Sequence, residues 1–266
     1  MHDFKYGRAT SVADAAQRLA AAGEGKLLAG GQTLLPVLKQ RLASPSDLVD
    51  LAGIAGLAGI SATAATVTVG AMTRHADVAG NADVRRLIPA LAELASGIGD
   101  PHVRNRGTMG GSVANNDPAA DYPAAVLGLG ATVKTDRRTI AADDFFQGLF
   151  TTALEDGEII TAIEFPVPER AGYVKFAHPA SRFCLVGVLV SKGPMGVRVA
   201  VTGAGQEGVF RVPAMESALA GSFTAKAIDG VTVAPDNLLS DMHAGPEYRA
   251  HLIGVLARRA VAKAGG

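Results

Sequence analysis

Glycines and short polar side chains are concentrated in one stretch of the chain, from Ile98 to Pro123. Glycines let the backbone turn tightly or approach a ligand closely, and short hydroxyl, amide and carboxylate groups can hydrogen-bond to that ligand. We therefore expect a loop that holds a molecule carrying phosphates and sugar hydroxyls; the alternative is a plain surface turn before a helix over 122–129. The residues behind this prediction are Gly107, Thr108, Gly110, Gly111, Ser112, Asn115, Asn116, Asp117 and Asp121.

A second glycine turn lies nearer the N-terminus, at residues 30–33 (Gly-Gly-Gln-Thr). It follows a short apolar segment at 26–29 and precedes helical apolar spacing over 34–42, so we expect a strand, a turn and a helix in succession. Such a junction points backbone N–H groups at a helix N-terminus, where unpaired donors and the helix dipole stabilise phosphate. It is neither a Walker motif nor a Gly-x-Gly-x-x-Gly motif, so an ordinary strand-to-helix turn is the alternative.

The elements around these two stretches follow an α+β pattern. A length of 266 residues indicates one to two domains. Ser11 and Thr73 are expected to cap helices, and the proline-rich turn at 165–170 is a plausible boundary region. Helices are predicted at 11–22, 73–78, 84–96, 122–129, 143–150, 212–220 and 246–264, and strands at 67–69, 131–136, 138–141, 158–165, 172–177, 185–192 and 197–202.

Charge and composition exclude several classes of partner. Lys plus Arg and Asp plus Glu number 25 each, so the formal net charge is zero, and Trp is absent. These features argue against nucleic-acid binding. No apolar run approaches the roughly 18 residues of a membrane span. The segment from Met1 to Tyr6 lacks the basic and apolar parts of a secretory signal, so we expect a cytoplasmic protein.

Metal and thiol chemistry are not indicated either. The single Cys184 excludes an internal disulfide and an iron–sulfur or zinc site made from this chain's own thiolates. It lies in the apolar run 183–190, where a buried small hydrophobe is expected rather than a reactive thiol. The six histidines show no metal-ligand spacing, so we predict no metal site. His75 is interpreted as a helix-surface or core-edge residue, with a place in a pocket as the alternative.

The two glycine motifs, in this order and at this separation, resemble those of a known family. The segment Ala29 to Pro36 (Ala-Gly-Gly-Gln-Thr-Leu-Leu-Pro) and the stretch 98–123 are similar to the FAD-binding medium subunit of molybdenum hydroxylases, the enzymes of carbon monoxide dehydrogenase and xanthine dehydrogenase type. The similarity continues through 158–166, 183–190 and 248–252, so it covers nearly the whole chain.

This resemblance implies a fold and a set of partners. The expected fold is a two-lobed FAD-binding domain over residues 1–175, with a small α/β lobe to about residue 55 and a mixed sheet lobe over 56–175. A C-terminal antiparallel sheet with helices follows over 176–266. The expected partners are an iron–sulfur small subunit and a large subunit with the molybdenum cofactor, in a dimer of heterotrimers. The chain would take electrons from the small subunit and pass them to an external acceptor.

The resemblance also implies which residues contact FAD. The first loop would wrap the pyrophosphate with main-chain donors, the second would meet phosphate and ribityl groups, and Asp121 would contact the cofactor. Apolar positions would lie near the flavin or the adenine. The implied cofactor-binding residues are Ala29, Gly30, Gly31, Gln32, Thr33, Leu34, Ile98, Thr108, Gly110, Gly111, Ser112, Asp117, Asp121, Ile160 and Phe176.

Some roles and two other functions stay open. Arg104 and Arg106 are interpreted as phosphate clamps or as structural ion-pair partners, and the separate roles of Asn115 and Asn116 are not assigned. No side chain is assigned as a catalytic acid or base, because flavin itself carries the redox chemistry. The alternatives are a self-contained FAD-dependent oxidase or reductase of similar fold and a nucleotide-binding subunit without a redox role.

Overall fold

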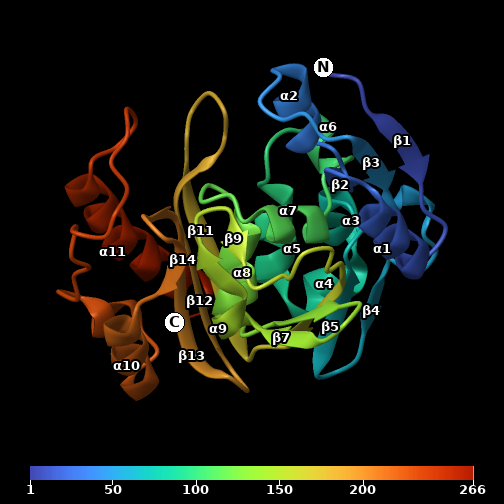
Figure 1. The fold of residues 1–266 in the computed structure, drawn as a ribbon. Coiled ribbons are helices and arrows are strands. Elements are labelled where there is room, and N and C mark those ends of the chain that lie inside the picture. Colours follow the sequence, from blue (N-terminus) through green and yellow to red (C-terminus); the bar gives the residue numbers. More distant parts are fainter. Residues whose placement is uncertain (266) are drawn as a thin grey trace.

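The first part of the molecule is a small parallel sheet with strand order β1-β3-β2, drawn in blue in Figure 1, a computed structural model that describes residues 1–265. Helix α1 connects β1 to β2, and the Ser11 hydroxyl accepts a hydrogen bond from the N–H of Asp14, as predicted for a helix cap. Buried apolar residues such as Val49 and Leu51 form its own small core. Its elements are β1 Lys5–Arg8, α1 Val12–Ala21, β2 Gly25–Leu28, α2 Leu34–Lys39, β3 Asp47–Asp50 and the 3-10 helix η1 Leu51–Gly53.

The second part is a five-stranded antiparallel sheet with order β4-β5-β10-β6-β7. In β5, buried Val67 and Val69 alternate with partly exposed threonines, the pattern of a sheet with one buried face. Its strands are β4 Ile60–Ala62, β5 Thr66–Gly70, β6 Thr132–Thr135, β7 Thr139–Ala141 and β10 Ile160–Pro166, and the two-stranded ribbon beside it is β8 Phe146–Gly148 with β9 Thr151–Thr152.

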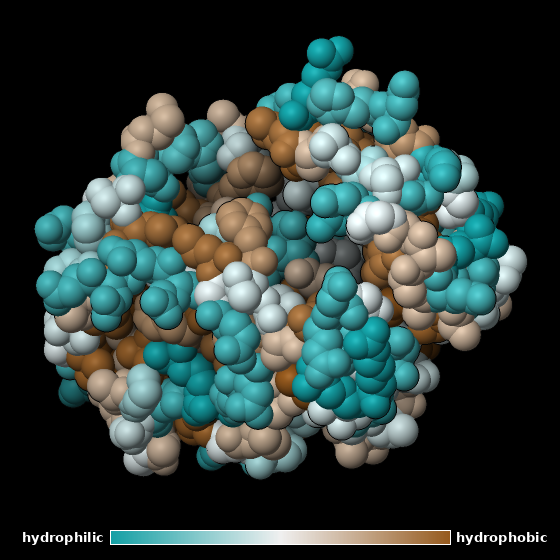
Figure 2. All heavy atoms as spheres, in the orientation of Figure 1, coloured by the Kyte–Doolittle hydropathy of each residue, from teal (hydrophilic) through white to brown (hydrophobic). Residues whose placement is uncertain are grey.

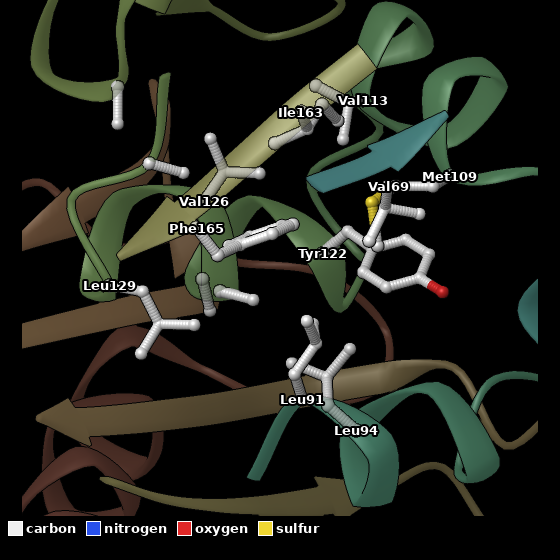
Figure 3. Close-up of a cluster of buried hydrophobic side chains, with 14 of the residues drawn as sticks. Val69, Leu91, Leu94, Met109, Val113, Tyr122, Val126, Leu129, Ile163 and Phe165 are labelled. Atoms are coloured by element: carbon white, nitrogen blue, oxygen red, sulfur yellow. The ribbon is translucent and has the colours of Figure 1, made fainter. Parts of the chain in front are cut away.

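Helices cover the buried face of this sheet and form the largest core of the chain. Figure 3 shows Met109 and Val113 of α7 and Tyr122 and Val126 of α8 gathered against Ile163 and Phe165 of β10. The helices of this part are α3 His75–Gly80, α4 Ala82–Leu87, α5 Pro89–Ser96, α6 Pro101–Arg104, α7 Met109–Asn115, α8 Tyr122–Gly128 and α9 Ala142–Phe145.

The third part is an antiparallel sheet with order β11-β12-β13-β14. Helices α10 and α11 cover one face, and α8 of the second part covers the other. Residues 184–191 of β12 are all buried, because both faces of the sheet are covered. Its elements are β11 Arg170–Ala177, β12 Cys184–Gly193, β13 Gly196–Gly205, β14 Gly208–Arg211, α10 Pro213–Gly221, the 3-10 helix η2 Ala225–Ile228 and α11 Pro246–Lys263.

The predicted α+β fold is therefore confirmed, but several elements differ from the sequence expectation. The helix predicted over 84–96 is split into α4 and α5, because Pro89 lacks an N–H and forces Ile88 out of helical geometry. The helix predicted over 143–150 ends at Phe145 and gives way to β8. Thr73 does not cap α3; its hydroxyl donates to the carbonyl of Gly59 at 3.0 Å, and the cap position is Arg74.

The stretch 98–123 also contains more regular structure than expected. Helices α6 and α7 lie within it, each capped by a side chain, from Asp100 and Thr108 respectively. The predicted division at residue 175 falls inside β11, which belongs to the third sheet throughout its length. Between the sheets the chain passes through residues 167–169 instead.

Candidate functional site

The two glycine loops are in direct contact although they belong to different parts of the fold. Gly30 lies so close to Arg106 that a methyl group on Gly30 would overlap the Arg106 carbonyl oxygen. A methyl group on Gly111 would lie 3.3 Å from the Cβ of Ala29. The absence of side chains at both glycines therefore lets the loops meet, and Figure 2 shows a hollow in the surface between the first part and the rest of the molecule.

The first loop offers a run of free backbone donors. Across the described chain, the N–H groups of residues 29–34 find no protein acceptor, whereas the next helical N–H, of Leu35, already bonds to the Gly31 carbonyl. Gly31 has a φ of +74°, which only glycine adopts without strain and which turns the chain into α2. A row of unpaired N–H groups at a turn before a helix favours an anionic oxygen ligand.

The second loop is held by the protein itself. The N–H groups of Met109 and Gly110 donate to the carbonyls of Thr73 (3.0 Å) and Ala71 (2.8 Å), and the N–H of Gly111 donates to the Thr108 hydroxyl at 3.2 Å. Gly110 packs against Ala71, where a methyl group would approach the Ala71 Cβ to 2.6 Å. Thr108, Gly110 and Gly111 thus fix the shape of this loop. The partly buried Ser112 hydroxyl makes no hydrogen bond within residues 1–265, so it is free for a ligand.

A third segment, residues 116–121, follows the second loop, and here Asn116 and Asp117 shape the backbone. Asn116 has a φ of +44°, and its amide donates to the carbonyls of Gly148 (2.8 Å) and Thr151 (2.9 Å), so it joins the end of α7 to the β8–β9 ribbon. The Asp117 carboxylate accepts a hydrogen bond from the N–H of Ala119 at 2.8 Å. Asn116 therefore has a structural role, which the sequence had left unassigned.

Asp121 is buried and bonded to strand β11 of the third part. The Tyr173 hydroxyl donates to its Oδ1 at 2.6 Å, and the Lys175 ammonium lies 2.9 Å from Oδ1 and 3.0 Å from Oδ2. Burial raises the pKa of Asp121, while the positive charge of Lys175 and the hydrogen bond from Tyr173 act in the opposite direction. Only 5% of the residue is exposed.

Three apolar residues predicted to contact the cofactor lie in different surroundings. Phe176 is on the opposite face of β11 from Tyr173 and Lys175, and its ring meets that of Tyr248 edge-on at a centroid distance of 6.3 Å. Ile160 is buried in the core of the second part, and Ile98 is half-buried at its margin. The sequence singled out neither Tyr173 nor Lys175. The alternation of side chains along a strand is the signal that could have found them, because it places residues 173 and 175 on one face and 176 on the other.

The two arginines of the second loop differ in surroundings. Arg104 donates from one guanidinium nitrogen to the carbonyls of Ile98 and Gly99, both at 3.0 Å, so it holds the turn before α6 through hydrogen bonds and not through an ion pair. Arg106 is exposed beside Gly30. Of the two, only Arg104 is thus tied down by hydrogen bonds within residues 1–265.

A buried pair of rings supports the second loop from behind. His75 and Tyr122 lie with ring centroids 5.2 Å apart, and the backbone N–H of His75 donates to the carbonyl of Gly107. A methyl group on Gly107 would come within 2.5 Å of the His75 Nε2 atom. Burial, with the nearby charge of Arg104, lowers the pKa of His75 to about 4, so the ring is neutral at pH 7. His75 is thus a core residue that packs under the loop. It is more deeply buried than the helix-surface or core-edge place expected from the sequence.

The geometry fits a phosphate-containing cofactor. Free N–H groups at 29–34 lie at a turn before a helix, and the contact between Gly30 and Arg106 brings them to the second loop, which carries the free hydroxyl of Ser112. Two lobes and two glycine loops of this kind define a nucleotide-cofactor-binding protein. No helix within residues 1–265 combines the length and hydrophobicity needed to cross a membrane.

Comparison with known proteins narrows this class. Residues 2–168 match the family model described as the FAD binding domain in molybdopterin dehydrogenase. The nicotine 6-hydroxylase medium subunit of Paenarthrobacter nicotinovorans is 36% identical to the chain, and the alignment covers 98% of this chain and 97% of that protein. The carbon monoxide dehydrogenase medium chain of Afipia carboxidovorans is 34% identical, with 98% of this chain and 96% of that protein covered.

Solved structures agree with the sequence comparisons. The structure of carbon monoxide dehydrogenase from Hydrogenophaga pseudoflava superposes with a TM-score of 0.88 at 34% identity and covers 98% of this chain and 97% of that one. The chain therefore belongs to the family of FAD-binding medium subunits of molybdenum hydroxylases. It is an FAD-binding subunit of an oxidoreductase, which confirms the family and the cofactor predicted from the sequence.

Proposed function

We propose that this chain is the electron-transferring flavoprotein of a molybdenum hydroxylase complex, taking electrons from an iron–sulfur subunit and passing them to an external acceptor. Bound FAD supplies the redox chemistry, since flavin exchanges one or two electrons. The residues of the chain bind and orient it. The observation that carries the proposal is the contact between Gly30 and Arg106, which brings the free N–H groups of the first loop to the border of the second.

In the proposed arrangement the N–H groups of residues 29–34 hold the pyrophosphate, and Ser112 and Asp121 border the rest of the cofactor. We assign no catalytic acid or base to the chain. Ile98, Asp117, Ile160 and Phe176 stay predictions as cofactor contacts. The division into an FAD-binding domain and a C-terminal domain is part of the proposal, with the boundary moved to residues 167–169, because β11 belongs to the third sheet.

The partners are proposed from the relatives. Two proteins similar over nearly the full length are named a medium subunit and a medium chain, and a third is named a subunit of a dehydrogenase complex, which favours an assembly of several subunits over a self-contained flavin oxidase. We propose an iron–sulfur small subunit and a molybdenum-cofactor large subunit, in a dimer of heterotrimers working in the cytoplasm. Substrate choice would belong to the large subunit.

The first experiment is the visible absorption spectrum of the purified full chain, before and after incubation with FAD and gel filtration. Oxidised-flavin bands that remain with the protein support FAD binding. Re-oxidation of the reduced flavoprotein by candidate acceptors, followed in a stopped-flow instrument, then tests the electron-transfer role. A chain that holds FAD but exchanges no electrons with the iron–sulfur partner or with any acceptor would contradict that role while leaving the cofactor assignment intact.

A further inference from the structure

A row of residues crosses three neighbouring strands of the third sheet beneath the loop that contains Asp121. Lys175 of β11 pairs with Gly187 of β12, and Gly187 pairs with Thr202 of β13. Side chains in such a row point to the same face of the sheet. This is the face that α8 and the loop before it cover.

Strand β13 holds the backbone of this loop. The Thr202 hydroxyl donates to the carbonyl of Ala120 at 2.7 Å, with the Pro118 carbonyl at 3.3 Å. The N–H of Gly203 donates to the same Pro118 carbonyl at 2.9 Å. Thr202 is 1% exposed, so this contact lies wholly inside the protein.

Strand β11 holds the Asp121 side chain at the other end of the loop. The Tyr173 hydroxyl donates to the Asp121 carboxylate at 2.6 Å, and Tyr173 is 5% exposed. Tyr173 and Thr202 therefore hold Asp121 and the carbonyls of Pro118 and Ala120 from two strands of the third sheet. Neither side chain lies at the surface of the hollow.

Gly187 creates the space in which these two side chains meet. A methyl group at this position would lie 2.5 Å from the Tyr173 hydroxyl oxygen, 2.7 Å from the Cys184 sulfur and 3.1 Å from the Thr202 methyl group. Cys184 fills the remaining volume, with its sulfur 3.7 Å from the Tyr173 oxygen. A side chain on Gly187 would push the Tyr173 hydroxyl away from Asp121.

We infer that Tyr173 and Thr202 are positioning residues for FAD. They hold the loop of residues 118–121 from the side of the third sheet, and so fix Asp121 in the place where it is proposed to border the cofactor. The inference rests on the proposed function, and it assigns part of the cofactor affinity to the third sheet. Gly187 is required because it leaves room for the Tyr173 hydroxyl.

The test uses variants that remove one hydroxyl and keep the shape of the side chain. Thr202→Val and Tyr173→Phe each delete the hydroxyl that holds the loop. Gly187→Ala keeps the Tyr173 hydroxyl but adds a methyl group that moves it away from Asp121. Ser191→Ala is the matched control. Ser191 is also buried in this sheet and donates to the Gly128 carbonyl at 2.6 Å, but it fastens the far end of α8 and not the loop.

The measurement is the Kd for FAD of each full-length variant, from the quenching of flavin fluorescence on binding, together with the Tm of the FAD-free protein. We expect Kd to rise about tenfold for Thr202→Val and for Tyr173→Phe, because each variant loses one hydrogen bond that holds the loop against the cofactor. Gly187→Ala should behave like Tyr173→Phe. Ser191→Ala should lower the Tm by a similar amount but change Kd less than about twofold.

Equal Kd values for the loop variants and for Ser191→Ala, at similar Tm, would overturn the inference and leave the FAD-binding role standing. A wild-type chain that binds no FAD would overturn both. If Tyr173→Phe does not fold, Thr202→Val and Gly187→Ala decide between the outcomes, because they act on the same loop through different atoms.

Discussion

Gly30 and Arg106 are in van der Waals contact across the boundary between the first two parts of the fold, and the contact exists because Gly30 has no side chain. The free N–H groups of the first loop therefore border the second loop directly. Together with the approach of Gly111 to Ala29, this contact brings the two loops together beside the hollow in which FAD is proposed to bind.

Gly30→Ala should weaken FAD binding at least tenfold, because the added methyl group would push the two loops apart. The measurement is a fluorescence titration with FAD. Gly80→Ala is the control, since in the described chain a methyl group on Gly80 meets no atom within 4 Å. It should leave the Kd unchanged. Unchanged affinity in Gly30→Ala would mean that the loops bind the cofactor independently.

Because His75 is buried in its neutral form, the free energy of unfolding should decrease as the pH is lowered. Its pKa is about 4 in the folded protein and about 6.5 in the unfolded chain, so the unfolded chain alone is protonated between these values. Stability from this residue is complete above pH 6.5 and is lost as the pH falls to about 4, by about 3 kcal/mol. Urea unfolding of wild type and His75→Phe at pH 7 and pH 4 measures it: the free energy of unfolding should fall less in the variant. Parallel losses would show that other groups are responsible.

The ion pair of Glu158 with Arg138 should stabilise the second part at neutral pH. The Arg138 guanidinium, helped by the Glu155 N–H and the Thr135 hydroxyl, lowers the pKa of Glu158 to about 2 although burial opposes this shift. Its contribution is present above about pH 4.5 and is lost as the pH falls toward 2. Glu158→Gln should cost about 2 kcal/mol at pH 7, because the half-exposed Arg138 guanidinium and the Glu155 N–H lose their buried carboxylate acceptor.

The matched control for Glu158 is Asp156→Asn, on an exposed neighbour in the same turn. Its free energy of unfolding should stay within about 0.5 kcal/mol of wild type. A Glu158→Gln protein as stable as this control at pH 7 would contradict the role of the ion pair.

Asn116 combines a positive φ with two side-chain hydrogen bonds, and two substitutions separate these contributions. Asn116→Gly keeps the backbone conformation and loses the bonds to Gly148 and Thr151, whereas Asn116→Ala loses the bonds and adds strain. Both variants should be less stable than wild type, and Asn116→Ala should be the worse by about 1 kcal/mol. Thermal unfolding measures the order, and the reverse order would show that the left-handed geometry is not maintained.

Much of the fold was predictable because local patterns agree with the tertiary structure. The helix over 246–264 and the hairpin of 185–192 with 197–202 follow directly from periodicity and turn residues. Helix α7 was not predicted, because Gly110, Gly111 and Asn115 disfavour a helix in isolation. Its first turn is held by the carbonyls of Ala71 and Thr73, a tertiary contact that no local pattern reveals.

The site was predictable only in part for the same reason. The glycine loops are continuous segments with a distinctive composition, so they could be found in the sequence. Thr202 carries no local signal, because its importance depends on pairing between strands and on the space above Gly187. Phe176, whose contact with the cofactor stays a prediction, lies one position from Lys175, and that step reverses the face of the strand.

The distribution of the site along the chain has a consequence for biosynthesis. Gly30 is synthesised early, whereas the loop before α8 is held by β13, which is synthesised much later. A nascent chain that has made both glycine loops still lacks the strand that holds this loop from behind. If Thr202 positions this loop for FAD as inferred, full affinity for the cofactor is reached only after translation has passed β13, and a chain truncated before that strand should bind FAD more weakly.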